Sequence, residues 1–228
     1  MSHSYLKKIL VTGGLGFIGS HTVVELQQQG FEVIIIDDLS NSSKEVLNGI
    51  TAITQQTPTF AQIDLKDKQA VSAFFSNHSD IGGIIHFAAY KAVGESVEKP
   101  LQYYDNNLGG IVNLLLEAEK LNRSLPFIFS SSCTVYGQAD ALPITEDAPI
   151  KKANSPYGNT KQIGEEILFD VTQSKDIVNV ISLRYFNPIG AHPSLEIGEL
   201  PIGKPQNLVP FITQTAAGLH DKLTIFGD

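Results

Sequence analysis

Tyr157 and Lys161 are the residues whose types and spacing could move a proton. They stand four positions apart, so in a helix they share one face, with the ammonium beside the phenol. A free tyrosine has a pKa of about 10, and lowering it by roughly 3 units requires about 4 kcal/mol of preferential stabilisation of the phenolate. A neighbouring lysine and a cationic cofactor ring can supply much of this. The same spacing also arises by chance on exposed helices, so its meaning depends on the elements around it.

The segment that carries this pair has the signals of a helix. Ser155 is a suitable N-cap, and Pro156 suits the first helical position. Apolar residues then recur every four positions, at Ile163, Ile167 and Val171, which indicates one buried face. We therefore expect a helix over residues 156–174, with the proton-transfer pair near its N-terminal end.

The composition is that of an ordinary globular protein and excludes several functional classes. Of the 228 residues, 42% are hydrophobic and 18% are charged, and the net charge is −8, so no basic stripe is available for nucleic acid. The N-terminus lacks an apolar signal region, and the apolar runs are short. One cysteine cannot form an internal disulfide, and the six dispersed histidines lack zinc-site spacing. We expect a cytoplasmic protein that binds no metal, nucleic acid or membrane.

Short β-branched runs alternate with helical stretches through the first 185 residues, a pattern typical of a parallel sheet covered by helices on both faces. The expected strands are 7–12, 32–36, 59–63, 83–87, 127–131 and 178–184. The expected helices are 17–29, 44–55, 66–77, 101–122 and 156–174. We therefore predict an α/β fold with a doubly wound parallel sheet and right-handed crossovers.

Two stretches leave more than one interpretation open. The expected helix 101–122 carries a narrow apolar seam, which suits either a face against the sheet or pairing with a helix of a second subunit. The seam residues are Leu101, Tyr104, Leu108, Ile111, Leu115 and Ala118. After Asn187, frequent Gly and Pro mark a long irregular segment, and such a loop is usually functional. One more helix, 208–219, and one strand, 223–226, are expected beyond it.

A glycine-rich segment follows the first expected strand and opens the first expected helix. It fits both Gly13-x-x-Gly16-x-x-Gly19 and Gly14-x-Gly16-x-x-Gly19. In either register the glycines permit a tight turn and let the backbone approach a pyrophosphate, whose charge would lie at the positive N-terminus of the helix. Such turns also close ordinary strand–helix units, so the motif alone is weak evidence.

Asp37 strengthens the dinucleotide interpretation. It stands at the end of the second expected strand, about 20 residues after the glycines, where a carboxylate can accept hydrogen bonds from both ribose hydroxyls. Asp37 and Asp38 would repel a 2′-phosphate, and no arginine follows closely. The sequence therefore predicts NAD rather than NADP.

Further motifs follow in order along essentially the whole chain. They are His86-Phe87-Ala88-Ala89, the segments 91–96 and 130–137, Tyr157-x-x-x-Lys161 and Arg184-Tyr185-Phe186-Asn187-Pro188. With the glycine motif they resemble the extended short-chain dehydrogenase/reductase superfamily and, within it, the UDP-glucose 4-epimerase family. The resemblance implies a Rossmann-type NAD-binding domain at residues 1–186 and an incomplete, C-terminal UDP-sugar-binding lobe at 187–228.

The resemblance also implies a reaction, the reversible epimerisation of UDP-galactose and UDP-glucose at C4. Tyr157 as phenolate would take the proton of the 4-hydroxyl while hydride passes to the nicotinamide, and the 4-ketose would turn over and receive the hydride on its other face. Lys161 would stabilise the phenolate and bond the nicotinamide ribose. Ser132, helped by Thr134, would hydrogen-bond the same sugar oxygen. Family members usually dimerise through helices that correspond to 101–122 and 156–174, so a homodimer is possible here.

Other positions match family contacts and are inherited from the resemblance. Near the pyrophosphate and adenosine these are Gly13, Gly16, Phe17, Ile18, Gly19, Asp37, Asp38, Leu39, Ser40, Asn41 and Ser42, with Asp64 and Leu65 near the adenine. Along the rest of the cofactor these are Phe87, Ala88, Ala89, Tyr90, Lys91, Asn106 and Phe186. The UDP pocket would be lined by Asn187, Asn207, Leu208, Thr224 and Phe226.

The chain departs from the family in two respects. Cys133 stands where alanine is common, and we interpret it as a small buried thiol because no histidine is evidently paired with it. Family members continue well beyond residue 226, with an arginine for the UDP phosphates, so the substrate lobe is expected to be incomplete. One alternative is therefore an NAD-binding module without turnover. A sugar-nucleotide dehydratase is the other, disfavoured because Cys133-Thr134-Val135 replaces the Asp-Glu pair of those enzymes.

Overall fold

The computed structural model describes residues 7–203, 205 and 207–223. Its strands are β1 (Lys8–Thr12), β2 (Glu32–Asp37), β3 (Thr59–Gln62), β4 (Gly83–His86), β5 (Leu125–Ser132) and β6 (Val178–Tyr185). Its helices are α1 (Phe17–Gln28), α2 (Val46–Thr54), α3 (Lys68–Asn77), α4 (Val93–Glu98), α5 (Pro100–Lys120), α6 (Pro156–Ser174) and α7 (Leu208–Ala216), and η2 (Cys133–Tyr136) is a short 3-10 helix. None of the described helices is long and apolar enough to cross a membrane.

The strands form one parallel sheet in the order β3-β2-β1-β4-β5-β6, which confirms the predicted doubly wound fold. β1 pairs with β2 on one side and with β4 on the other, so the direction of winding reverses at β1. Ligands of open parallel sheets bind beyond the carboxyl ends of the strands, next to such a reversal. The loops that leave β1, β4 and β5 therefore surround the expected binding crevice.

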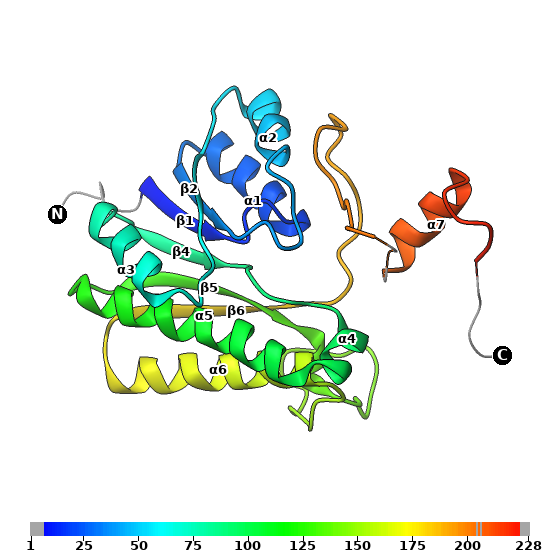
Figure 1. Cartoon of the computed structure of the whole chain (residues 1–228). Coiled ribbons are helices and arrows are strands. Elements are labelled where there is room, and N and C mark those ends of the chain that lie inside the picture. The colour runs from blue at the N-terminus through cyan, green and yellow to red at the C-terminus, as the bar shows by residue number, and fades with distance from the viewer. Residues whose placement is uncertain (1–6, 204, 206, 224–228) are drawn as a thin grey trace.

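Apolar side chains cover both faces of this sheet. Leu10, Ile34 and Ile84 belong to one buried cluster, beneath α3, α5 and α6, whereas Val11 and Ile35 belong to a second one, beneath α1 and α2. Figure 1 shows these two helical layers on opposite sides of the strands. Because successive strand residues point to opposite faces, a strand buried on both sides has to be apolar throughout. This explains the continuous runs in β1 and β2.

Most predicted elements are present with small shifts at their ends. α3 begins at Lys68, two residues later than expected, because the Asp67 carboxylate accepts hydrogen bonds from the backbone N–H groups of Gln69 and Ala70, both at 3.0 Å. α4 and η2 are not among the expected elements, since six and four residues are too few to display a helical period.

The predicted seam on α5 is correct only in its second half. Ile111, Leu115 and Ala118 are buried, but Leu101 is 80% exposed. The buried positions in the first half are Tyr103 and Asn107. Both have polar atoms that form hydrogen bonds inside the protein. A search for buried positions by apolar residues alone does not find Asn107, because its side chain is polar.

The C-terminal part of the described chain stands apart from the sheet. α7 follows the long segment after β6 and lies away from the other helices in Figure 1. It ends at Ala216 rather than at residue 219, because Gly218 adopts a φ of 78° and the N–H of Leu219 returns to the carbonyl of Gln214 at 2.9 Å. The expected strand 223–226 has only Leu223 among the described residues, so that prediction lies outside them.

α6 is held close to the sheet by packing and by one ion pair. Gly164 faces Phe129 of β5, where an added Cβ would lie 2.8 Å from the ring. At the next residue of α6, both carboxylate oxygens of Glu165 accept hydrogen bonds from the guanidinium of Arg184 in β6, at 3.0 and 2.7 Å. Ser131 near the end of β5 donates to the same carboxylate at 2.5 Å. These contacts fix the helix that carries Tyr157 and Lys161.

We expect Gly164→Ala to lower the free energy of unfolding by about 1–3 kcal/mol, because overpacking against Phe129 outweighs the better helix propensity of alanine. Gly109→Ala in α5 is the matched control. Its Cβ would meet only one lysine side-chain carbon, at 3.9 Å, so this change should stabilise the chain by up to about 1 kcal/mol. Urea unfolding of both variants measures the two effects, and equal effects in the same direction would contradict the packing argument.

Candidate active site

The β1–α1 turn is built from backbone contacts that leave no room for side chains. Gly13 has a φ of +67°, and a Cβ on it would lie 2.7 Å from the N atom of Ala88. A Cβ on Gly19 would lie 2.2 Å from the carbonyl oxygen of Gly13. Gly16 differs, because its added Cβ would meet only that same carbonyl, at 3.3 Å. Side chains are therefore excluded at Gly13 and Gly19, whereas a Cβ at Gly16 would meet a single, less severe contact.

The same turn fits a dinucleotide phosphate. Gly16 is the N-cap of α1, makes no side-chain capping bond, and no acidic residue lies in the first turn. The N-terminus of a twelve-residue helix therefore presents unpaired N–H groups at Phe17 and Ile18 to an anion. These are the positions predicted to lie near the pyrophosphate.

Asp37 ends β2 beside this turn, as predicted, but its carboxylate already has protein partners. It is only 7% exposed. One oxygen accepts from the N–H of Leu15 at 3.1 Å, and the other accepts from the N–H of Leu39 at 3.0 Å and the hydroxyl of Ser42 at 2.7 Å. A carboxylate has about four acceptor positions, so capacity remains for a ribose hydroxyl. Asp37 thus orders the loop that is expected around the adenosine.

Asp38 orders the next part of that loop. Its carboxylate accepts from the backbone N–H of Ser40 at 2.9 Å and from the hydroxyl of the same residue at 2.6 Å. Asn41 follows in the same exposed turn. All of the predicted adenosine contacts from Asp37 to Ser42 therefore lie at the end of β2 or in the short loop that follows it.

The predicted residues after β3 and β4 also lie at the carboxyl edge of the sheet. Asp64 and Leu65 follow β3, and residues 87–91 follow β4. His86, at the end of β4, is buried, and its pKa falls to about 3 because of burial and the charge of Lys161. It shares a hydrogen bond of 2.7 Å with the hydroxyl of Thr12. A neutral His86 thus ties the ends of β1 and β4 together under the crevice.

The structure brings the four predicted catalytic residues to the end of β5. Ser132 is the last residue of β5, and its hydroxyl accepts a hydrogen bond from the N–H of Thr134 in η2 at 3.2 Å. Gly158 lets α6 approach η2, since an added Cβ would lie 3.2 Å from the Cβ of Thr134. Tyr157 and Lys161 occupy the first turns of α6, with the lysine Nζ 5.8 Å from the centre of the tyrosine ring.

The hydroxyl of Thr134 is buried and has no hydrogen-bond partner within the described residues. A buried hydroxyl without a hydrogen-bond partner lowers the stability of the fold, and such groups are uncommon in native structures. Here it lies against α6, where a Cβ added to Gly158 would be 3.3 Å from the Thr134 hydroxyl oxygen.

Burial lowers the pKa of Lys161 and raises the pKa of Tyr157. The pKa of Lys161 falls to about 8 because the side chain is desolvated. Its ammonium donates to the carbonyl of Ser130 at 2.7 Å and lies 5.0 Å from the ring centre of Phe129. Burial raises the pKa of Tyr157, and a hydrogen bond with Ser132 opposes that rise. The protein alone therefore does not produce the low tyrosine pKa expected from the sequence.

Asn107 is a site-forming residue that sequence reasoning missed. It is 3% exposed and bonds both backbone groups of Tyr90, accepting from its N–H at 2.8 Å and donating to its carbonyl at 3.0 Å. It also donates to the hydroxyl of Thr160 at 3.0 Å, which in turn donates to the carbonyl of Tyr157 at 2.7 Å. Asn107 thus connects the β4 loop to α6. Asn106, predicted instead, donates to the side-chain oxygen of Asn107 at 3.0 Å.

The remaining predicted residues are less closely gathered. Phe186 directly follows β6 and is 54% exposed, Asn187 is exposed, and Leu208 at the start of α7 is 72% exposed. Asn207 donates to Glu199. Thr224 and Phe226 lie outside the described residues. The described part of the chain therefore brings the predicted catalytic residues together, whereas the predicted UDP residues within it are exposed to solvent.

Cys133 is a free, partly buried thiol between Ser132 and Thr134. Among the described residues, no group of three or more His, Cys, Asp or Glu side chains could hold a metal ion.

The low pKa of Lys161 makes stability depend on pH. Its unfolded pKa is 10.5 and its folded pKa is about 8, so between these values the unfolded chain binds more protons and stability rises with pH. We expect Lys161→Met to be more stable than the parent at pH 7 by up to about 3 kcal/mol, with the advantage shrinking from pH 8 to 10.5. Urea unfolding of the cofactor-free chain measures this, with exposed Lys152→Met as the control for charge removal. An advantage that does not change with pH would contradict it.

The comparisons with known proteins agree with this geometry. The NAD dependent epimerase/dehydratase family matches residues 9–228. A UDP-glucose 4-epimerase of Bacillus subtilis is 50% identical over 220 residues, which are 96% of this chain and 64% of that protein. One from Erwinia amylovora is 49% identical over 220 residues, 96% of this chain and 65% of that protein. The chain thus spans slightly less than two thirds of these relatives.

Solved structures show the same relationship. The Stenotrophomonas UDP-glucose 4-epimerase with bound NAD and formylated UDP-arabinopyranose has a TM-score of 0.91 and 47% identity, covering 97% of this chain and 65% of its own. The Bifidobacterium longum enzyme in complex with NAD⁺ and UDP has a TM-score of 0.92 and 43% identity over the same shares. This chain therefore belongs to the NAD dependent epimerase/dehydratase family and is a homologue of the UDP-glucose 4-epimerases.

Proposed function

We propose that this chain binds NAD and carries the catalytic centre for reversible C4 epimerisation of UDP-galactose and UDP-glucose. The observation that supports this most directly is the convergence of Ser132, Thr134, Tyr157 and Lys161 at the carboxyl end of β5, the edge of the sheet from which the β1–α1 turn also leaves. Relatives that are about half identical are named UDP-glucose 4-epimerases. The binding of NAD and UDP in a related structure supports both ligand classes.

In this mechanism Tyr157 moves the proton of the sugar 4-hydroxyl. Bound NAD supplies a reversible hydride acceptor and a positive nicotinamide ring. Ser132 hydrogen-bonds the phenol and orients the sugar oxygen. Lys161, close to the phenol and desolvated, favours the phenolate by its charge.

The opposing pKa directions explain why this site needs its cofactor. Burial raises the pKa of Tyr157, so the phenol stays protonated at neutral pH in the cofactor-free chain. The Lys161 ammonium is engaged by the carbonyl of Ser130 at 2.7 Å. A further positive charge next to the phenol, or a turn of the ammonium toward it, is required to form the general base.

Binding without turnover is the second candidate function. The observation that favours it is the exposure of Asn187 and Leu208, which leaves the UDP positions open within the described residues. A homodimer through α5 and α6 is compatible with either function, because Val112, Leu116 and Phe169 on these helices are 41%, 38% and 63% exposed.

The test is conversion of UDP-galactose to UDP-glucose by the NAD-loaded chain, with the Bacillus subtilis relative as the positive control. We expect conversion, and we expect Tyr157→Phe to lower its rate by about 10²–10⁴-fold while NAD remains bound, because the substitution removes only the proton-transfer group. A folded chain that holds NAD and converts nothing would select binding without turnover. A product lighter by one water would indicate a dehydratase.

Thr134→Val should raise the stability of the chain and lower its epimerase activity. Replacing the unpartnered hydroxyl by a methyl group of similar shape should stabilise the ligand-free chain by about 1–2 kcal/mol. If that hydroxyl serves the substrate, the same variant should epimerise roughly tenfold more slowly. Thermal unfolding and the turnover assay measure the two effects. A variant that is less stable, or equally active, would show that the hydroxyl has another role.

A further inference from the structure

The segment after β6 folds into a compact hairpin, which we call the strap and define as residues 188–199. Its two arms are joined by a hydrogen bond from the N–H of His192 to the carbonyl of Ile197 at 3.0 Å. A Cβ on Gly198 would lie 3.1 Å from the Cβ of Ala191, so the arms also touch. Figure 1 shows this hairpin in orange beside α1 and α2.

One residue anchors the strap in the protein core. Ile197 is 4% exposed and belongs to the apolar cluster beneath α1 and α2. It packs on Gly49 of α2, where an added Cβ would lie 2.9 Å from the Ile197 side chain and 2.5 Å from the carbonyl of Glu196. The neighbouring Leu195 is 86% exposed. Gly49, in the middle of α2, therefore leaves the space in which the Ile197 side chain is buried.

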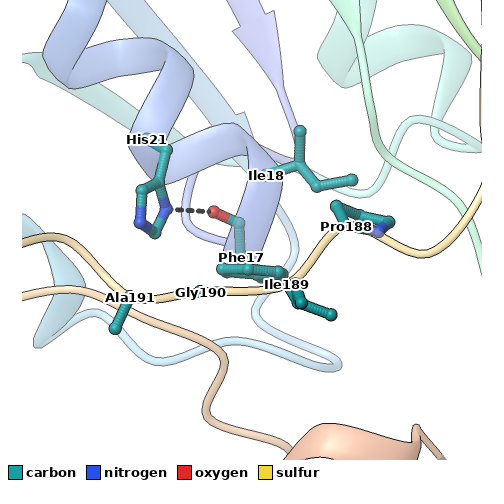
Figure 2. A pocket seen from close by; sticks show the side chains of 7 residues that line it. All are labelled: Phe17, Ile18, His21, Pro188, Ile189, Gly190 and Ala191. Atoms are coloured by element: carbon teal, nitrogen blue, oxygen red, sulfur yellow. Dashed lines mark hydrogen bonds between the residues drawn. The ribbon is translucent and has the colours of Figure 1, made fainter.

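The strap also reaches the two sides of the expected cofactor site. Its first arm, residues 188–191, forms a cavity of about 240 Å³ with Phe17, Ile18 and His21 at the N-terminus of α1. Figure 2 shows the strap passing across this end of the helix. At its other end the carboxylate of Glu199 lies 3.5 Å from the Nζ of Lys91 in the loop after β4. The strap thus spans from α2, across α1, to the β4 side of the crevice.

We propose that the strap retains the dinucleotide, with Ile197 as the residue whose burial keeps it closed. This inference rests on the proposed binding of NAD at the β1–α1 turn. A pyrophosphate at Phe17 and Ile18 would lie at the helix end that the strap crosses, so its release depends on how often the strap opens. Opening of the strap removes the Ile197 side chain from its contact with Gly49 of α2. In many enzymes a loop movement of this kind limits the rate at which bound molecules are released.

Three variants test the strap in the full 228-residue chain, loaded with NAD and freed of excess nucleotide. The rate at which NAD appears in an ultrafiltrate should rise at least tenfold in Ile197→Ala. Gly49→Ala should also raise it at least tenfold, although alanine is the better helix former, because its Cβ displaces Glu196 and Ile197. Leu195→Ala, on the same hairpin but exposed, should stay within twofold of the parent.

Hydrogen exchange at the amide of His192, which bonds the Ile197 carbonyl, supplies a second readout without NAD. It should accelerate in Ile197→Ala and Gly49→Ala and stay unchanged in Leu195→Ala. If the parent retains NAD and Ile197→Ala releases it at the parent rate, the strap proposal fails alone. If the parent holds no NAD, the proposed function and the strap proposal both fail.

Discussion

The close backbone contact at the start of the sheet is the constraint on which the other features depend. Gly13 touches the backbone of Ala88, and Gly19 touches the carbonyl of Gly13. These contacts bring the end of β1, the first turn of α1 and the loop after β4 within one crevice. The positive end of α1 and the loop that continues to α4 are oriented by the same contacts. A side chain at Gly13 or Gly19 would separate the elements that form the crevice.

The proposed catalytic pair, Tyr157 and Lys161, depends on a second set of supports, which hold α6. Glu165 connects α6 to β5 and β6 through Ser131 and Arg184, and Asn107 connects its first turns to the loop after β4. Rigid support is needed because burial disfavours the charged forms of both the partly buried Tyr157 and the buried Lys161. Because the pKa of Tyr157 is raised and that of Lys161 is lowered, a further positive charge is needed beside the phenol before the phenolate is favoured.

Much of the fold was predictable because strands buried on both faces are apolar throughout, and the glycines and caps mark where α1 and α6 begin. The spacing of Tyr157 and Lys161 and the position of Asp37 after β2 followed from the same patterns. Asn107 was not predictable, because a buried amide gives no periodic signal and its partners lie 17 and 53 positions away. The raised tyrosine pKa was also beyond the sequence, because it is caused by burial in the folded chain, and the Lys161 ammonium donates to the carbonyl of Ser130. The long segment after β6 was marked as functional by its glycines and prolines, but only the structure reveals its seat on Gly49.

The Asp37 carboxylate accepts hydrogen bonds from three protein donors, and this limits how the protein can be redesigned. Enzymes are commonly converted from one nicotinamide cofactor to its phosphorylated form by replacing the acidic residue after the second strand. Here that carboxylate also supports Leu15, Leu39 and Ser42, so its replacement would loosen the turn that receives the phosphates. If the chain binds NAD as proposed, changing its coenzyme therefore requires new partners for three donors, and a single exchange at this position would impair the recognition of either form.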